Sequence, residues 1–147
     1  MVSAKKFFTS EQQEDIKQAV MNAELDTSGE IRVHIENKCS GDGLIRATQI
    51  FKKLKMDRTE LHNGVLFYLA IQNRKFAIIG DAGINAAVPE NFWEQIKTKM
   101  LNRFREGNFT LGLSEAITEA GAQLKQHFPH QKNDVNELPD DISFGKK

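Results

Sequence analysis

The chain has 147 residues, 39% of them hydrophobic and 27% charged, and its 20 basic side chains balance 20 acidic ones. These totals are typical of one globular domain, and zero net charge argues against a nucleic-acid-binding or membrane-surface protein. The single cysteine, Cys39, excludes an internal disulfide. The sequence shows no signal peptide and no apolar run of about eighteen residues that would span a membrane. We therefore expect a soluble, cytoplasmic monomer.

The first helix and strand follow from hydrophobic spacing. Ser10 and Gln13 form a capping pair that starts a helix, and residues 26–29 break it. Residues 30–36 alternate strictly between polar and apolar side chains, which predicts a strand at or near a sheet edge with one face in water. A second helix then ends near Met56.

Two nearly continuous apolar runs, residues 65–71 and 76–79, flank four polar residues and predict a β-hairpin. The first run lacks polar alternation, so its strand should be covered on both faces. Two helices follow. Gly107 suits the C-terminal cap of the first, and the second stops before Pro129 with Gly121 in its interior, where a glycine favours close packing against a neighbour.

The element order is helix, strand, helix, strand, strand, helix, helix. It predicts a single-domain α/β sandwich, in which a central mixed sheet has the hairpin at its core and helices on both faces. We assign residues 1–8 to an N-terminal extension and residues 9–129 to the domain. Residues 130–147 form an acidic and polar C-terminal tail, which we expect to be flexible.

Oxygen-bearing side chains from distant segments are predicted to meet at one sheet edge. A right-handed crossover makes the first two strands parallel, and the hairpin then returns its far end to the start of both. Carboxylate, amide and hydroxyl oxygens suit Ca²⁺ or Mg²⁺. The predicted metal ligands are Asp81, Glu30, Asn63, Thr27 and Asp26. The structural alternative is that Asp81 caps a turn, Asn63 caps a strand and Glu30 points to water.

Other motifs are weak. Gly80 and Gly83 lack the remainder of a dinucleotide or phosphate loop. Six residues separate Cys39 from Arg46, which argues against the Cys-x5-Arg cradle of cysteine phosphatases. The four histidines show no zinc-binding spacing, and His34 belongs to the strand face expected to be wet. No catalytic residue and no organic cofactor is assigned.

Several segments in combination resemble the TPM domain, the family named after thylakoid lumen, photosystem II repair and nematode receptor-modulator proteins. These segments are residues 27–33, 63–70, 76–84, 92–93 and, near the end of the chain, 136–142. The resemblance implies an α/β sandwich that binds a divalent cation, usually calcium, at a sheet edge. The polar positions that match the motif are Thr27, Glu30, Asn63 and Asp81. Some relatives are described as acid phosphatases.

Three functions remain open. The first is a domain that binds a divalent cation. The second is a metal-dependent, acid-phosphatase-like hydrolase, although the sequence shows no dedicated nucleophile or general base. The third is a non-catalytic interaction module whose tail, residues 133–144, docks on its own domain or on a protein partner that the sequence does not specify.

Overall fold

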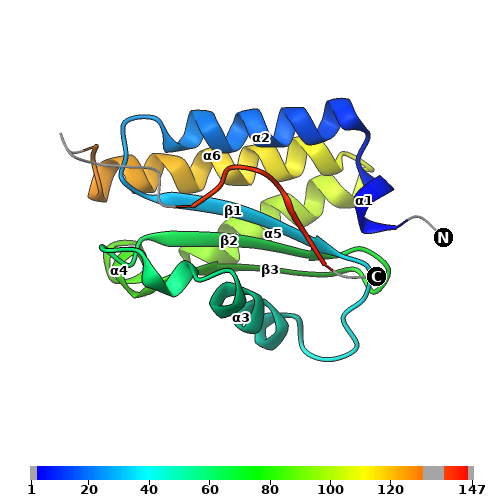
Figure 1. The fold of residues 1–147 in the computed structure, drawn as a ribbon. Helices are drawn as coiled ribbons and strands as arrows, with labels where there is room; N and C mark the ends of the chain where they lie inside the picture. The colour runs from blue at the N-terminus through cyan, green and yellow to red at the C-terminus, as the bar shows by residue number, and fades with distance from the viewer. Residues whose placement is uncertain (1–2, 131–137, 146–147) are drawn as a thin grey trace.

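A four-stranded mixed sheet forms the centre of the protein, which a computed structural model describes for residues 3–130 and 138–145 (Figure 1). Its strands, in the spatial order β3-β2-β1-β4, are β1 (Glu30–Glu36), β2 (Gly64–Ala70), β3 (Lys75–Gly80) and β4 (Ser143–Phe144). β1 runs parallel to β2, with Glu30 opposite Gly64, and β3 runs antiparallel to β2, with Gly80 opposite Val65. The predicted α/β fold with a hairpin inside a mixed sheet is confirmed.

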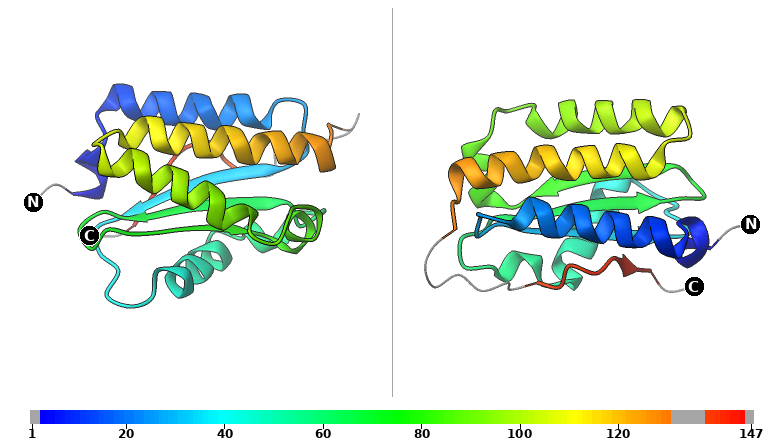
Figure 2. Two further views of the ribbon diagram at one scale, coloured as in Figure 1. Left: turned by 180° about the vertical axis from the view of Figure 1, so that it is seen from behind. Right: turned by 90° about the horizontal axis from the view of Figure 1, so that it is seen from above.

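Helices cover both faces of this sheet, as predicted. One face carries α2 (Ser10–Glu24), α5 (Phe92–Arg105) and α6 (Phe109–His127), and the opposite face carries α3 (Gly43–Lys53) (Figures 1 and 2). Three short elements join them: α1 (Ala4–Phe7), α4 (Ala82–Ala87) and the 3-10 turn η1 (Met56–Arg58). No helix in the described part of the chain is long and apolar enough to cross a bilayer.

β2 is the best-buried element because its two rows of side chains enter two different cores. Val65, Phe67 and Leu69 pack with α2, α5 and α6, and the intervening residues pack with α3. Every residue of the strand is buried. The unbroken apolar run therefore corresponds to a central strand, as expected for a sheet with helices on both faces.

The capping pair of α2 lies one residue earlier than predicted. The Gln12 N–H donates to Thr9 Oγ1 at 3.1 Å, and the Thr9 N–H donates to Gln12 Oε1 at 2.9 Å. Thr9 and Ser10 are both favourable capping residues, and the same spacing from either reaches a glutamine. Gln13 instead holds the preceding segment, because its amide donates to the Phe8 carbonyl at 3.1 Å.

Gly121 allows α6 to approach α2 closely, as its sequence position predicts. A Cβ at residue 121 would lie 2.6 Å from Ala23 Cβ and 2.9 Å from the Ala23 carbonyl oxygen. We expect Gly121→Ala to lower the free energy of unfolding by about 1–3 kcal/mol, since overpacking outweighs the roughly 1 kcal/mol gained in helix propensity. Urea denaturation measures this, and adding Ala23→Gly should recover part of the loss. A single variant as stable as the wild type would contradict the packing.

The polar face of β1 is buried, so the prediction of a wet face is wrong. Glu30, His34 and Glu36 are only 2%, 4% and 5% exposed. The reason is that residues 138–145, here named the C-terminal strap, run along the outer edge of β1 and contribute β4, with His34 opposite Ser143. The sequence assigns this segment to a tail because a two-residue strand among acidic residues carries no periodic signal.

Candidate functional site

Three of the predicted ligands lie along one rim of the sheet, where β1 and β2 begin and β3 ends. The Glu30 N–H donates to the Asn63 carbonyl at 3.3 Å, and the Asp81 N–H donates to the Gly64 carbonyl at 2.9 Å. Adjacent strands are about 4.8 Å apart, so Glu30 and Asp81 are separated by roughly 10 Å along the rim. Glu30 and Asn63 are therefore immediate neighbours, and Asp81 is the most distant of the three.

Thr27 and Asp26 occupy the turn that precedes β1. The Thr27 hydroxyl bonds to the Leu124 carbonyl at 3.0 Å and to the Phe128 carbonyl. Asp26 has a φ of 64°, and its carbonyl accepts the His130 N–H at 2.9 Å. These bonds attach the turn to the end of α6, through the side chain of Thr27 and the backbone of Asp26.

Asp81 starts α4 and orients His62. One carboxylate oxygen accepts the Ala82 N–H at 2.7 Å, and the other lies 3.2 Å from His62 Nδ1. The His62 side chain is 56% exposed, so its imidazole is held by a carboxylate and still open to water. Asp81 therefore caps a helix rather than the turn of the structural alternative, and it is also a partner for His62.

A pocket of about 390 Å³ lies at the start of β1 and collects three acidic side chains. Glu24 comes from the end of α2, Glu30 from β1 and Asp140 from the C-terminal strap. The described residues that line the pocket include neither Lys nor Arg. Of these three acids, the sequence predicts only Glu30 as a ligand. Glu24 resembles an ordinary acidic residue at a helix end, and Asp140 lies in the segment assigned to the tail.

This crowding raises the pKa of Glu24 well above its ordinary value. Burial is the largest cause, and a hydrogen bond with the Asp140 carboxyl and the negative charges of Asp140 and Glu30 act in the same direction. The Ile31 N–H, which donates to Glu24 Oε2 at 2.8 Å, opposes the shift. A glutamate with a raised pKa keeps its proton to a higher pH, and a metal cation can take the place of that proton.

Asn63 lies behind the wall of this pocket, in contact with a residue that lines it. Its side chain is 1% exposed, and its Nδ2 lies 3.3 Å from the hydroxyl of Ser28, which lines the pocket. Its Oδ1 is buried and accepts no hydrogen bond from the described residues. Leaving such an oxygen unpaired costs about 1–3 kcal/mol, which a cation at this position would offset.

The donor atoms of the pocket are oxygens, the element that a hard cation such as Ca²⁺ prefers as a ligand. Ca²⁺ accepts carboxylate, amide, hydroxyl and water oxygens in irregular arrangements. Within residues 3–130 and 138–145, however, no three His, Cys, Asp or Glu side chains form a ready-made metal cage. Binding there would therefore require the acidic side chains to move closer together.

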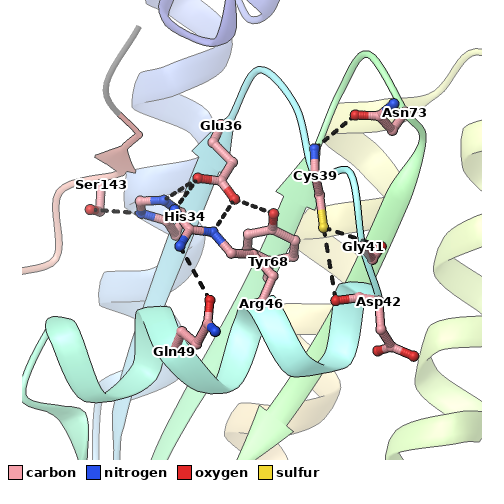
Figure 3. A network of polar contacts seen from close by, with 10 residues as sticks. All are labelled: His34, Glu36, Cys39, Gly41, Asp42, Arg46, Gln49, Tyr68, Asn73 and Ser143. Atoms are coloured by element: carbon pink, nitrogen blue, oxygen red, sulfur yellow. Dashed lines mark hydrogen bonds and ion pairs between the residues drawn. The ribbon is translucent and has the colours of Figure 1, made fainter.

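A second polar cluster lies at the opposite end of β1 (Figure 3). Arg46 of α3 donates to both oxygens of Glu36, Nε to Oε2 at 2.9 Å and Nη2 to Oε1 at 3.0 Å, and the Tyr68 hydroxyl also donates to Oε2. Burial raises the pKa of Glu36, but these donors more than offset it and leave the pKa below its ordinary value. The donors saturate the carboxylate, which makes this cluster a structural network.

His34 beside this network should make stability depend on pH. Burial lowers the pKa of His34 to about 4 from 6.5; Arg46 and Arg32 also disfavour its charge, and Glu36 favours it. Between these values the unfolded chain binds the extra proton, so stability is lost as the pH falls from 6.5 towards 4. We expect the wild type to lose up to about 3 kcal/mol more than His34→Gln across this range. Urea denaturation at pH 7, 5 and 4 checks this, and parallel pH profiles would contradict it.

Comparisons with known proteins agree with this architecture. Residues 1–123 match the TPM domain. The structure is similar to the NMR structure of BA42 from the psychrophilic bacterium Bizionia argentinensis, with a TM-score of 0.88 and 43% identity over 99% of this chain and 100% of that one. No curated protein matches this chain.

Two more distant solved structures share the fold alone. One is the N-terminal domain of a P. gingivalis protein, with a TM-score of 0.70 and 19% identity over 84% of this chain and 82% of that one. The other is the N-terminal domain of the cg2496 protein of Corynebacterium glutamicum, with a TM-score of 0.65 and 11% identity over 89% and 82%. The family match and the similarity to BA42 together establish that this chain belongs to the TPM domain family.

Proposed function

We propose that this TPM domain binds a hard divalent cation, Ca²⁺ or Mg²⁺, in the pocket between Glu24, Glu30 and Asp140. The observation that supports this most strongly is that three separate chain segments bring carboxyl groups to one pocket whose described lining contains no Lys or Arg. Like charges in such an arrangement destabilise a fold unless a proton or a cation neutralises them. A cation would neutralise all three groups at once.

The proposed ligand set overlaps with the one predicted from the sequence. Glu30 and Asn63 are common to both, and the buried Oδ1 of Asn63 supplies a neutral oxygen. Glu24 and Asp140 replace the other three predicted ligands. Asp81 caps a helix, the Thr27 hydroxyl bonds to the end of α6, and the exposed Asp26 does not line the pocket. Ligands from three segments suit Ca²⁺ better than Mg²⁺, since Mg²⁺ demands near-ideal octahedral geometry.

Thermal unfolding in EDTA, Mg²⁺ and Ca²⁺ tests the proposal. Calcium at a hundredfold excess over its dissociation constant should stabilise the wild type by about 2.7 kcal/mol, which raises the melting temperature by roughly 5–10 °C. Glu30→Gln and Asp140→Asn should lose most of this shift. The matched control is Glu14→Gln, an exposed acid on α2, which should keep it. Identical melting curves in all three solutions would contradict the proposal.

The variant Asp81→Asn distinguishes cation binding in this pocket from cation binding at Asp81, a ligand predicted from the sequence. If the cation binds between Glu24, Glu30 and Asp140, this variant should keep most of the calcium-induced shift. If Asp81→Asn abolishes the shift and Glu30→Gln does not, the cation binds at the opposite end of the rim, beside His62.

The pair formed by His62 and Asp81 favours phosphomonoester hydrolysis as a second candidate function. An exposed imidazole held by a carboxylate 3.2 Å away is suited to proton transfer, and it lies on the same rim as the acidic pocket. We would then expect a calcium- or magnesium-dependent rate on an artificial phosphate ester, reduced about 100-fold in His62→Gln. No activity above background across pH and metals would eliminate this candidate.

A further inference from the structure

The C-terminal strap, residues 138–145, follows the outer edge of β1 and supplies one wall of the acidic pocket (Figure 1). Its backbone is fixed near the end, where the Gly145 N–H donates to the Ile35 carbonyl at 2.9 Å. Its apolar anchors enter the cores on both faces of the sheet, and they are Leu138, Ile142 and Phe144. The strap is thus an extended segment that crosses from the pocket to the far end of β1.

The attachment of the strap is small in area, and charged groups act on it in both directions, since Asp141 pairs with Lys17 while Asp140 lies beside two glutamates. Only two strap residues pair with β1, and Ile142 and Phe144 are only partly buried. Between these anchors and Leu138, the strap brings Asp140 against Glu24 and Glu30. Asp140 is hydrogen-bonded to Glu24 there, so the strap meets the end of α2 and the start of β1 through carboxyl groups that a cation can bridge.

We propose that a divalent cation clamps the strap to the domain by binding Asp140 together with Glu24 and Glu30, so that removal of the cation releases the strap. This inference rests on the proposed function. The three acids are not preassembled as a metal cage in the described residues, so binding has to draw Asp140 inward. A cation that binds the docked strap better than the released one shifts the equilibrium towards docking, and docking raises cation affinity by the same factor.

The clamp controls access to the edge of β1. Ser143 Oγ lies 3.0 Å from His34 Nδ1, and a Cβ at Gly145 would lie 2.4 Å from Glu36 Cβ, so the strap lies directly on these side chains. A released strap leaves a strand edge with free backbone groups, which can accept an extended peptide by strand addition. The cation therefore determines whether this edge is closed by the chain itself.

Amide hydrogen exchange in the full-length chain tests the clamp. The Gly145 amide, which bonds to the Ile35 carbonyl, should exchange about tenfold or more slowly in saturating Ca²⁺ than in EDTA. Asp140→Asn should abolish this calcium response, because it removes the strap's carboxylate ligand. Asp141→Asn is the matched control: Asp141 is 72% exposed and pairs with Lys17 at 2.9 Å, so this variant should retain the response.

Because cation binding and strap docking strengthen each other, the calcium affinity provides a second test. A purely local effect of the metal would not change with the docking of the strap. Phe144→Ala removes an anchor of the strap and leaves all three acids in place, so it should weaken calcium affinity severalfold. If calcium raises the melting temperature but leaves Gly145 exchange and the affinity of Phe144→Ala unchanged, the clamp is overturned and the proposed function stands. If the wild type binds no cation, both fail.

Discussion

Glu36→Ala should lower the free energy of unfolding by about 3–5 kcal/mol, the largest effect expected for any polar side chain of β1. The substitution leaves the Arg46 guanidinium and the Tyr68 hydroxyl without the carboxylate to which both donate. Tyr68 is fully buried, so water cannot readily replace the hydrogen bond that its hydroxyl loses, whereas Arg46 is 38% exposed and can be hydrated in part. Denaturant unfolding monitored by circular dichroism measures the loss.

An exposed pair of the same chemistry provides the control. Arg103 donates to both oxygens of Glu115, at 2.9 and 3.4 Å, but the two side chains are 42% and 49% exposed. We expect Glu115→Ala to cost less than about 1 kcal/mol. If Glu36→Ala and Glu115→Ala cost the same, burial does not strengthen the network at the end of β1.

Calcium affinity should increase about tenfold per pH unit near neutrality, because the cation must displace the proton held by Glu24. The pKa of Glu24 is raised by burial and by Asp140, so this proton is still bound at pH values where an exposed glutamate has lost it. Without a cation, the same proton stabilises the fold at low pH, and that stability is lost as the pH rises through the elevated pKa. Calorimetric titration at pH 6, 7 and 8 measures the effect.

Two comparisons distinguish proton release from a general effect of pH. Binding heats in two buffers with different protonation enthalpies should differ by the heat of about one proton. Glu24→Gln should bind calcium more weakly and with little dependence on pH, because its amide holds no exchangeable acidic proton. An affinity that is constant from pH 6 to 8 in the wild type would show that no proton is displaced.

The fold was predictable wherever periodicity and burial agree. The apolar run of β2 predicts a strand covered on both faces, and all seven of its residues are buried. The crossover rule predicts the parallel pairing of β1 with β2, and this pairing brings Glu30 next to Asn63. Gly107, with a φ of 84°, likewise ends α5 at the predicted cap.

The candidate site was only partly predictable because two of its acids carry no local signal. Glu24 reaches the pocket from the end of a helix, and Asp140 reaches it from a segment 110 residues beyond Glu30 in the sequence. The alternation in β1 predicts a wet face, but the strap pairs along the edge of β1 and α3 supplies Arg46 to Glu36 on that face. Residues 133–137 of the predicted docking tail lie outside the described residues, so the structure addresses only its second half.

The most direct measurement is a calcium titration of the ¹⁵N-labelled chain followed by backbone amide resonances. If one cation joins Glu24, Glu30 and Asp140, the largest shifts should appear in the end of α2, the start of β1, Asn63 and the strap, all fitting a single dissociation constant. Shifts confined to the surroundings of Asp81 and His62, or no shifts at millimolar calcium, would contradict the account.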